Sequence, residues 1–172
     1  MKKRLPLASL WLATLLLAAA CSSKATYVHL VPIPPDSKFA VGEVFDETGF
    51  SFPENDDDAI VLAAAMAEAL EKALARKALS GEGQWILNVT LKEYEPGNAF
   101  KRWLIPGFGT TRLTAVASVV DPEGNVAAEI PAERKIGFGG GYTVGAWRYV
   151  FDDLAEIIVE SLVERERQAP TE

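Results

Sequence analysis

Two stretches of the chain carry apolar residues at the three-and-four spacing of an amphipathic helix. The first predicts a helix over 57–79, with Ile60, Leu70 and Leu74 on one stripe. The second predicts a helix over 146–167, where the same period runs from Val150 to Leu162. Charged residues interrupt every long apolar run of the first stretch, so we expect a core helix instead of a membrane span.

An acidic run, Glu-Asn-Asp-Asp-Asp at 54–58, precedes the first predicted helix. Several carboxylates close together can bind calcium, but this run lacks the ligand spacing and the central glycine of a calcium loop. We expect instead that Asn55 or Asp56 caps the helix and that the other carboxylates lie near its positive end. Gly81 and Gly83 are predicted to end the helix.

Four further stretches have the composition or the two-residue alternation of strands, and they cover 38–45, 85–91, 111–120 and 126–138. The residues 121–125, Asp-Pro-Glu-Gly-Asn, are typical of a tight turn that joins the last two strands into a hairpin. Pro131 within the last strand favours an edge or a bulge. The order strand, helix, three strands, helix predicts a single α+β domain, with a mostly antiparallel sheet and two helices packed on one face.

The N-terminus has the three parts of a secretory signal. The basic residues 2–4 are followed by an uncharged, mostly apolar run over 5–20. This run is shorter than the ~20 apolar residues that cross a bilayer. Leu-Ala-Ala-Ala-Cys at 17–21 resembles a bacterial lipoprotein signal, which implies a diacylglycerol on Cys21 as the first mature residue. The alternative is that Cys21 is an ordinary residue near a conventional cleavage site.

Ser22 bears on the membrane to which such a lipid would attach. In lipoproteins of this kind an aspartate after the cysteine favours the inner membrane, so serine favours the periplasmic face of the outer membrane, with the inner membrane as second choice. The prolines within 32–35 predict an extended tether. The expected organisation is a signal peptide over 1–20, a lipidated cysteine and tether over 21–37, a domain over 38–167 and a disordered tail over 168–172.

A family resemblance appears further along the chain. Arg-Trp-Leu-Ile-Pro-Gly-Phe-Gly at 102–109 is followed by a predicted strand, the turn at 121–124, a returning strand, three glycines at 139–141 and a helix. This succession resembles a bacterial lipoprotein family known only as a domain of unknown function (DUF4410), from Val41 onward. Thr110-Thr111-Arg112 stands where members commonly have a small residue and a lysine. The resemblance implies an envelope location and supplies no catalytic residues, because the family has no established reaction.

Composition narrows the partners of the protein. The 172 residues carry a formal net charge of −7, and without the first twenty residues, which hold three basic groups and no acidic one, the charge is −10. Nucleic-acid binding draws its affinity from clustered Lys and Arg, so we expect none. One Cys excludes a disulfide framework, and one His makes a histidine-based metal site improbable.

Motifs for catalysis and for nucleotides are incomplete. Tyr142 follows the glycine run at 137–141. A phosphate-binding loop needs Gly-Lys-Ser or Gly-Lys-Thr there, and a dinucleotide-binding fold needs a further glycine at the position of Tyr142. We therefore expect no nucleotide and no other cofactor. Ser80 and Ser118 have no nucleophile elbow around them, and His29 lies in the expected tether. Four carboxylates can still meet in space: Glu93, Glu95, Asp121 and Glu133.

Three classes of function remain. The leading one is a non-enzymatic, periplasm-facing accessory or assembly module that is held to the membrane by its lipid and binds another envelope protein. The second is a binding module for a lipid, glycan or small ligand, and the third is a hydrolase that acts through carboxylates. The candidate partner-binding residues belong to two aromatic, glycine-containing loops: Phe100, Lys101, Arg102, Trp103, Phe108, Tyr142 and Trp147.

These aromatic side chains have two interpretations. Long apolar side chains on a connection either fold back over the core or are kept for a partner. The first interpretation is favoured, because a sheet covered on one face needs side chains to close its open end. In the second, Trp103 and Phe108 anchor a partner or touch the membrane surface, with Lys101 and Arg102 near anionic headgroups.

Overall fold

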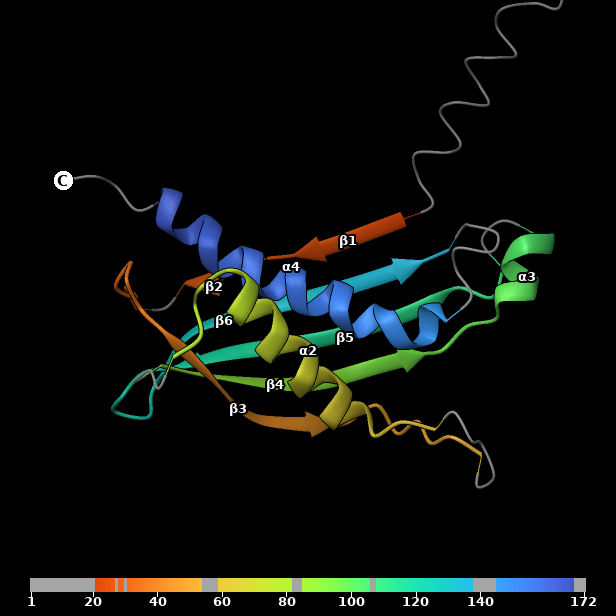
Figure 1. The fold of residues 1–172 in the computed structure, drawn as a ribbon, viewed down its shortest axis with the longest axis horizontal. Helices are drawn as coiled ribbons and strands as arrows, with labels where there is room; N and C mark the ends of the chain where they lie inside the picture. Colours follow the sequence, from red (N-terminus) through yellow and green to blue (C-terminus); the bar gives the residue numbers. More distant parts are fainter. Residues whose placement is uncertain are drawn as a thin grey trace, which may run out of the picture.

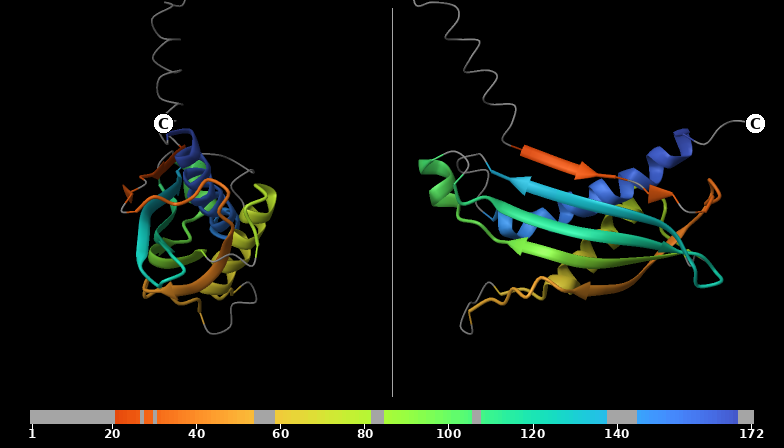
Figure 2. Two further views of the ribbon diagram at one scale, coloured as in Figure 1. Left: turned by 90° about the vertical axis from the view of Figure 1, so that its left-hand side faces the viewer. Right: turned by 180° about the vertical axis from the view of Figure 1, so that it is seen from behind.

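The computed structural model describes residues 21–26, 28–29, 31–53, 59–81, 85–105, 108–137 and 145–168. The strands are β1 (Cys21–Ala25), β2 (Val28–His29), β3 (Phe39–Asp46), β4 (Trp85–Glu95), β5 (Thr111–Val120) and β6 (Val126–Ile136), and the helices are α2 (Leu62–Arg76), α3 (Ala99–Leu104) and α4 (Ala146–Gln168). One six-stranded sheet has the order β1-β6-β5-β4-β3, with β2 also paired to β6. The long helices α2 and α4 cover one face of this sheet, and α3 lies beyond one end (Figures 1 and 2).

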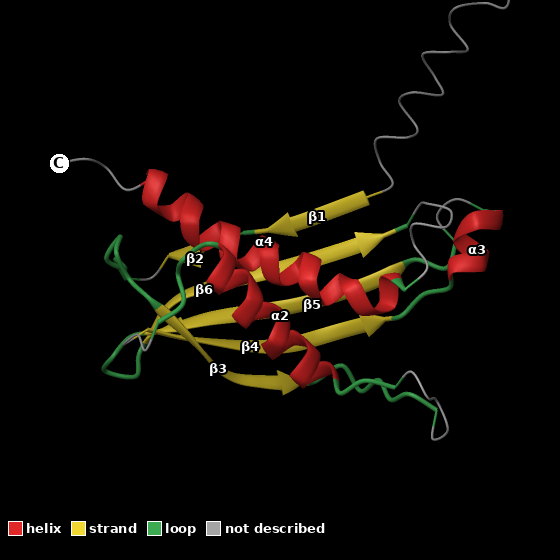
Figure 3. Ribbon diagram, in the orientation of Figure 1, coloured by secondary structure: helices red, strands yellow, loops and turns green. Residues whose placement is uncertain are grey.

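The predicted α+β fold is confirmed, including the order of its main elements and the two helices on one face. Strand β5 has the predicted bounds, and β6 ends two residues earlier than expected. The sheet is antiparallel except between β3 and β4, which are parallel because α2 crosses between them. Figure 3 shows that α3, which the sequence pattern did not predict, is a separate short helix between β4 and β5.

The core lies between the sheet and the two long helices. Alternate residues of β5, from Leu113 to Val119, are fully buried on the helix side. Leu70 of α2 and Leu154 and Ile158 of α4 are equally buried in the same apolar cluster. The alanine side chains on β5 and β6 are small, so the helices can pack close to the sheet. Burial of each large aliphatic side chain contributes about 1.5–3 kcal/mol.

Helix α2 is shorter than predicted at both ends. It begins at Leu62 after Val61, which makes no side-chain cap hydrogen bond, and residues 59–61 are not helical. The expected caps Asn55 and Asp56 lie outside the described residues. At the other end the helix stops at Arg76, because Ala78 adopts a left-handed φ of 55°.

This end of α2 has the hydrogen bonds of a Schellman motif. The backbone N–H of Leu79 donates to the carbonyl oxygen of Leu74 over 2.9 Å, and that of Ala78 donates to Ala75 over 3.0 Å. The expectation that Gly81 and Gly83 end the helix was therefore wrong. The terminating turn comes earlier and places an alanine where glycine is usual.

The segment predicted as a tether over 21–37 instead contributes to the sheet. Strand β1 pairs antiparallel with β6, from Cys21 opposite Ile136 to Ala25 opposite Ala132. Ile33 is buried in the core cluster. The physical reason is that β6 would otherwise present an unpaired edge, which a passing extended segment can cover through backbone hydrogen bonds alone.

Pro131 lies opposite the interruption between β1 and β2. Pairing with β1 ends at Ala132 and pairing with β2 begins at Glu129. Pro131 has no N–H to donate to a neighbouring strand, although its carbonyl accepts a hydrogen bond from the backbone N–H of Thr26 over 3.1 Å. The proline thus marks a gap in the outer ladder of β6, while β6 itself is not an edge strand.

Other expectations fall on residues that the structure does not describe. These are the signal peptide over 1–20, the glycine run 139–141 and the tail beyond Gln168, which is the last residue of α4. Among the described residues, none of the helices has the length and hydrophobicity needed to span a bilayer.

Candidate functional site

Helix α3 is held at the end of the sheet by a closed loop between β4 and β5. Asn98 caps the helix, because its Oδ1 accepts a hydrogen bond from the backbone N–H of Lys101 over 2.9 Å. The backbone N–H of Asn98 donates to the carbonyl of Gly109, also over 2.9 Å, and the Thr111 hydroxyl donates to the carbonyl of Pro96 over 2.8 Å. These bonds fix the base of the loop to the ends of both strands.

Gly109 is required at this position for two reasons. Its φ of +68° lies in the left-handed region, and a Cβ there would stand 2.6 Å from the backbone oxygen of Asn98. The close approach of the two arms of the loop therefore depends on the missing side chain.

The loop exposes four large apolar side chains, which we call the apolar tip: Phe100, Leu104, Ile105 and Phe108. Their exposed fractions are 67%, 61%, 49% and 63%. Side chains of this size normally bury most of their area, so a cluster of four on one short loop is a candidate interaction surface. The favoured sequence interpretation was that these side chains fold back over the core. Phe100 and Phe108 do not do so.

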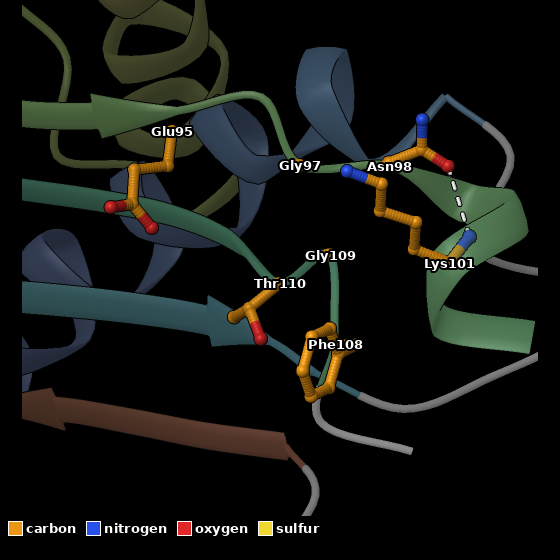
Figure 4. Close-up of a pocket in the computed structure, with 7 residues that line it drawn as sticks. All are labelled: Glu95, Gly97, Asn98, Lys101, Phe108, Gly109 and Thr110. Carbon is orange, nitrogen blue, oxygen red and sulfur yellow. Dashed lines mark hydrogen bonds between the residues drawn. The ribbon is translucent and has the colours of Figure 1, made fainter. Parts of the chain in front are cut away.

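An open cavity of about 600 Å³ adjoins the apolar tip. Its lining residues are Glu95, Gly97, Asn98, Lys101, Phe108, Gly109 and Thr110. Figure 4 shows Phe108 on one side of this space and Lys101 on the other, with the Asn98–Lys101 hydrogen bond drawn. The cavity is an open, solvent-exposed depression whose lining includes Lys101, Glu95 and Phe108. It lacks the enclosed apolar walls of a typical small-molecule pocket.

The structure brings together some of the predicted partner-binding residues. Phe100, Lys101 and Phe108 lie on the same loop and are exposed. Arg102 and Trp103 belong to α3, although their side chains are outside the described residues, as is Tyr142 altogether.

Trp147 has a different environment from the apolar tip. Its ring packs edge-on against Phe52 at 5.8 Å between centroids, within a group of rings that includes Phe50, Tyr94 and Phe151. The guanidinium of Arg148 lies 4.7 Å from the Trp147 ring centre. The phenol of Tyr94 on β4 donates a hydrogen bond to the Trp147 carbonyl over 2.6 Å, and this bond helps to hold the start of α4 on the sheet.

The face of the sheet away from α2 and α4 carries a second group of exposed residues. We call this the open face, and its apolar members follow the strand register: Phe45 on β3, Ile86 on β4, Val116 and Val120 on β5, and Val126 and Pro131 on β6. Phe45, Ile86 and Val126 are 50%, 39% and 42% exposed. No described helix lies over them (Figure 2).

The half of the open face nearer to α3 is charged. Arg112 of β5 donates from Nε to Oε1 of Glu133 over 2.7 Å and from a terminal nitrogen to Oε1 of Glu93 over 3.1 Å. Lys135 contacts the same oxygen of Glu133 over 2.9 Å. Hydrogen bonds from Lys135 and Arg112 lower the pKa of Glu133 below its ordinary range. This carboxyl is therefore held ionised, which is the opposite of what a general acid needs.

Of the four carboxylates that the sequence left free to meet in space, only two do so. Glu93 and Glu133 converge on Arg112, whereas Glu95 lines the cavity beside the apolar tip and Asp121 accepts from Asn125 in the β5–β6 turn. The described residues contain no group of three His, Cys, Asp or Glu placed to bind a metal ion.

A small cavity of about 230 Å³ lies beside Glu133. Thr26, Thr114, Pro131, Ala132 and Glu133 line it. The hydroxyl of Thr114 is buried and has no hydrogen-bond partner among the described residues. Sequence reasoning missed Arg112 and Thr114, although both stand at the positions of β5 that alternate with buried ones.

Cys21 lies at the same end of the sheet as the apolar tip. It is opposite Ile136 on β6, and Ile136 is opposite Thr111, the residue at which β5 begins after the α3 loop. Figure 1 shows the beginning of β1 and helix α3 on the same side of the molecule, with the β5–β6 turn at the other end.

Comparison with protein families shows to which family the chain belongs. A family model described as a domain of unknown function (DUF4410) matches residues 51–140, more than half of the chain. The chain belongs to the DUF4410 family. The predicted resemblance is thereby confirmed, and the DUF4410 match runs from the segment before α2 to the end of β6, so it includes the apolar tip and most of the open face. No curated protein matches the sequence significantly.

Solved structures show relatives of the fold. A variant of PelC from Paraburkholderia phytofirmans, a dodecamer, superposes with a TM-score of 0.57 at 12% identity, over 82% of this chain and 97% of PelC. A second PelC dodecamer gives 0.49 at 13% identity over the same shares. A Caulobacter crescentus CB15 protein provisionally assigned as a lipoprotein gives 0.39 at 10% identity, over 77% and 89%. At 12% identity, the similarity to the first PelC structure shows a shared fold and carries no information on function.

Proposed function

We propose that this DUF4410 chain is a lipid-anchored, non-enzymatic module of the bacterial cell envelope that binds another envelope protein through the open face of its sheet. Its anchor is a lipid on Cys21, at the periplasmic face of the outer membrane. The observation that carries the proposal is the set of exposed apolar side chains on a sheet face that no described element covers.

The open face has the composition of a protein interface. Phe45 on the edge strand β3 is half exposed, and it begins a row that continues through Thr90 and Val116 to Pro131. Apolar residues with a charged group beside them, here the Arg112 cluster, resemble the apolar core and polar rim of protein–protein contacts. Antiparallel sheets tolerate a solvated face, but that face is then normally polar.

The state of the carboxylates supports a non-enzymatic role. A hydrolase that acts through two carboxyl groups needs one of them protonated near neutral pH. Glu133 instead has a lowered pKa, and both Glu93 and Glu133 form ion pairs with Arg112. These groups therefore act as a structural ion-pair network on the sheet surface.

The lipid anchor rests on the sequence around Cys21. A basic start, an apolar run and Leu-Ala-Ala-Ala-Cys form a complete lipoprotein signal, and Ser22 favours the outer membrane. Two or more long acyl chains would hold the protein stably, since each buried CH₂ adds ~0.8 kcal/mol.

Site-specific photocrosslinking in cells tests the proposed binding. A photoreactive phenylalanine analogue is placed at Phe45 or at Ile86 on the open face, and at Glu71 on the exposed side of α2 as the control. We expect a defined protein adduct from the two open-face positions and none from Glu71. Adducts of equal pattern from all three positions, or none from Phe45 and Ile86, would refute the proposed interface.

Self-association is a second candidate for the open-face contact. The PelC structure that superposes on 82% of this chain is a dodecamer. If this chain also assembles with copies of itself, the adducts from Phe45 will be multiples of its own mass and will contain only its own peptides. If the partner is another envelope protein, foreign peptides will be found in the adduct.

A further inference from the structure

The structure assigns the apolar tip (Phe100, Leu104, Ile105, Phe108) a role that the proposed function does not use: we propose that it inserts into the lipid surface that holds Cys21. The molecule would then contact the membrane at two points, its lipid and its tip. This inference rests on the lipid anchor of the proposed function and adds a second site, with phospholipid as its ligand.

The first argument is position. Cys21 and Thr111 are separated by one strand, β6, because both are opposite Ile136. Two strand spacings place their Cα atoms ~10 Å apart. Phe108 precedes Thr111 by three residues, so it lies at most ~10 Å beyond the level of Cys21 along the chain. A lipid on Cys21 therefore brings the apolar tip to the membrane surface without any rearrangement.

The second argument is depth. Apolar faces of membrane-surface helices are buried ~5–10 Å below the headgroup boundary. An anchor at Cys21 and a ring no more than ~10 Å further out match this range. Helix α3 is only six residues long, so it would lie in the interface and not cross the bilayer.

The third argument is the chemistry of the tip. The tip carries four exposed apolar side chains together with an exposed Lys101, and Arg102 follows in the sequence. Apolar side chains enter the acyl region, while a lysine stem can extend its ammonium to anionic headgroups. The chain without its first twenty residues is acidic, with a net charge of −10, so a cation at this end would orient it toward an anionic membrane.

The fourth argument is rigidity. Insertion of a loop costs less when the loop is already ordered in its bound form. Here the Asn98–Gly109 backbone hydrogen bond and the Asn98 cap fix α3 on the strand ends. The apolar tip is therefore presented as a preformed wedge.

Docking at the tip would also orient the open face. The β5–β6 turn lies at the end of the sheet away from α3 (Figure 1). With α3 in the lipid surface, the sheet would stand on the membrane, and the exposed Ile86 and Val126 would project into the periplasm. Those residues are members of the surface proposed to bind a protein.

Depth-dependent fluorescence quenching of the lipidated protein tests this inference. Variants with one introduced cysteine, Phe108→Cys, Phe100→Cys or Glu123→Cys, are labelled with an environment-sensitive dye, and exposed Glu123 in the β5–β6 turn is the control. In native protein the sulfur of Cys21 is a thioether, so only the introduced thiol accepts the dye. Vesicles of phosphatidylethanolamine and phosphatidylglycerol carry nitroxide-labelled lipid as the quencher.

We expect nitroxide lipid to reduce the emission at positions 108 and 100 by about two-fold or more, with a blue shift, and to leave position 123 unchanged. Equal, weak quenching at all three positions of a lipidated protein would overturn tip docking alone. Wild-type protein that accepts the dye at Cys21 would refute the lipid anchor, and with it the proposed location. A photoreactive group at 108 that gives a defined protein adduct in cells, in place of lipid adducts, would also overturn the inference.

Discussion

Replacement of Tyr94 by phenylalanine should weaken the docking of α4 in a way that depends on pH. Tyr94 is 5% exposed, and its hydroxyl donates to the carbonyl of Trp147 in the first turn of α4 over 2.6 Å. The ring stays in contact with Phe50 and Phe151 in the variant, so only the hydrogen bond is lost. One such bond contributes about 1–1.5 kcal/mol to the free energy of unfolding. The expected decrease in melting temperature is about 2–5 °C.

The pH dependence follows from the phenol. Burial raises the pKa of Tyr94 well above its ordinary value of 10.0. Below pH 10 the phenol is neutral in both the folded and the unfolded chain, and the stabilising hydrogen bond is fully present. Above pH 10 the unfolded chain ionises while the folded one does not, so the free energy of unfolding falls by about 1.4 kcal/mol per pH unit.

Urea titrations of both proteins at pH 7, 10 and 11 measure this effect. We expect wild type to be the more stable at pH 7 by about 1–1.5 kcal/mol, and the difference to close near pH 11, because Tyr94→Phe has no phenol to ionise at this position. A difference that stays constant from pH 7 to 11 would refute the argument from burial. Equal stability at pH 7 would refute the argument from the hydrogen bond. Tyr94→Ala, which also removes the ring, should cost about 3–5 kcal/mol at pH 7.

Two further predictions concern backbone positions. Ala78→Gly should raise the free energy of unfolding by about 0.5–1 kcal/mol, since relief of the left-handed strain at φ 55° exceeds the entropy cost of glycine, whereas Ala75→Gly inside α2 should lower it by about 1 kcal/mol. Gly109→Ala should lower the melting temperature by more than Gly124→Ala, because both residues have positive φ but only at Gly109 would a Cβ meet the backbone, at Asn98. Thermal unfolding followed by circular dichroism measures both pairs, and equal effects within a pair would contradict the local geometry described.

Strands and helices with a long hydrophobic period could be predicted from the sequence. Leu113, Ala115, Ala117 and Val119 mark every second position of β5, and both ends of this strand were predicted. Helix α3 has six residues, which is less than two turns, so no period could reveal it. Strand β1 was missed because its pairing with β6 uses backbone hydrogen bonds, which an extended segment can make without any hydrophobic pattern.

The candidate site was harder to predict than the fold. Phe108 and Trp147 are both aromatic residues near glycines, yet one is 63% exposed and the other packs against Phe52. Trp147 lies at the start of α4, which packs on the core, whereas Phe108 lies in the loop beyond the end of the sheet. The Arg112 ion pairs join residues about twenty positions apart, so only the strand register brings them together.

The mass of the mature protein from membranes of the bacterium that makes it tests the proposed lipid anchor most directly. Our account predicts an N-terminal peptide that begins at Cys21 and carries a thioether-linked diacylglycerol, and it predicts that Cys21→Ser abolishes this modification and releases the protein or leaves an unprocessed precursor. A mature protein with an unmodified Cys21 thiol would contradict the account, and the apolar tip would then lose the anchor that brings it to the membrane.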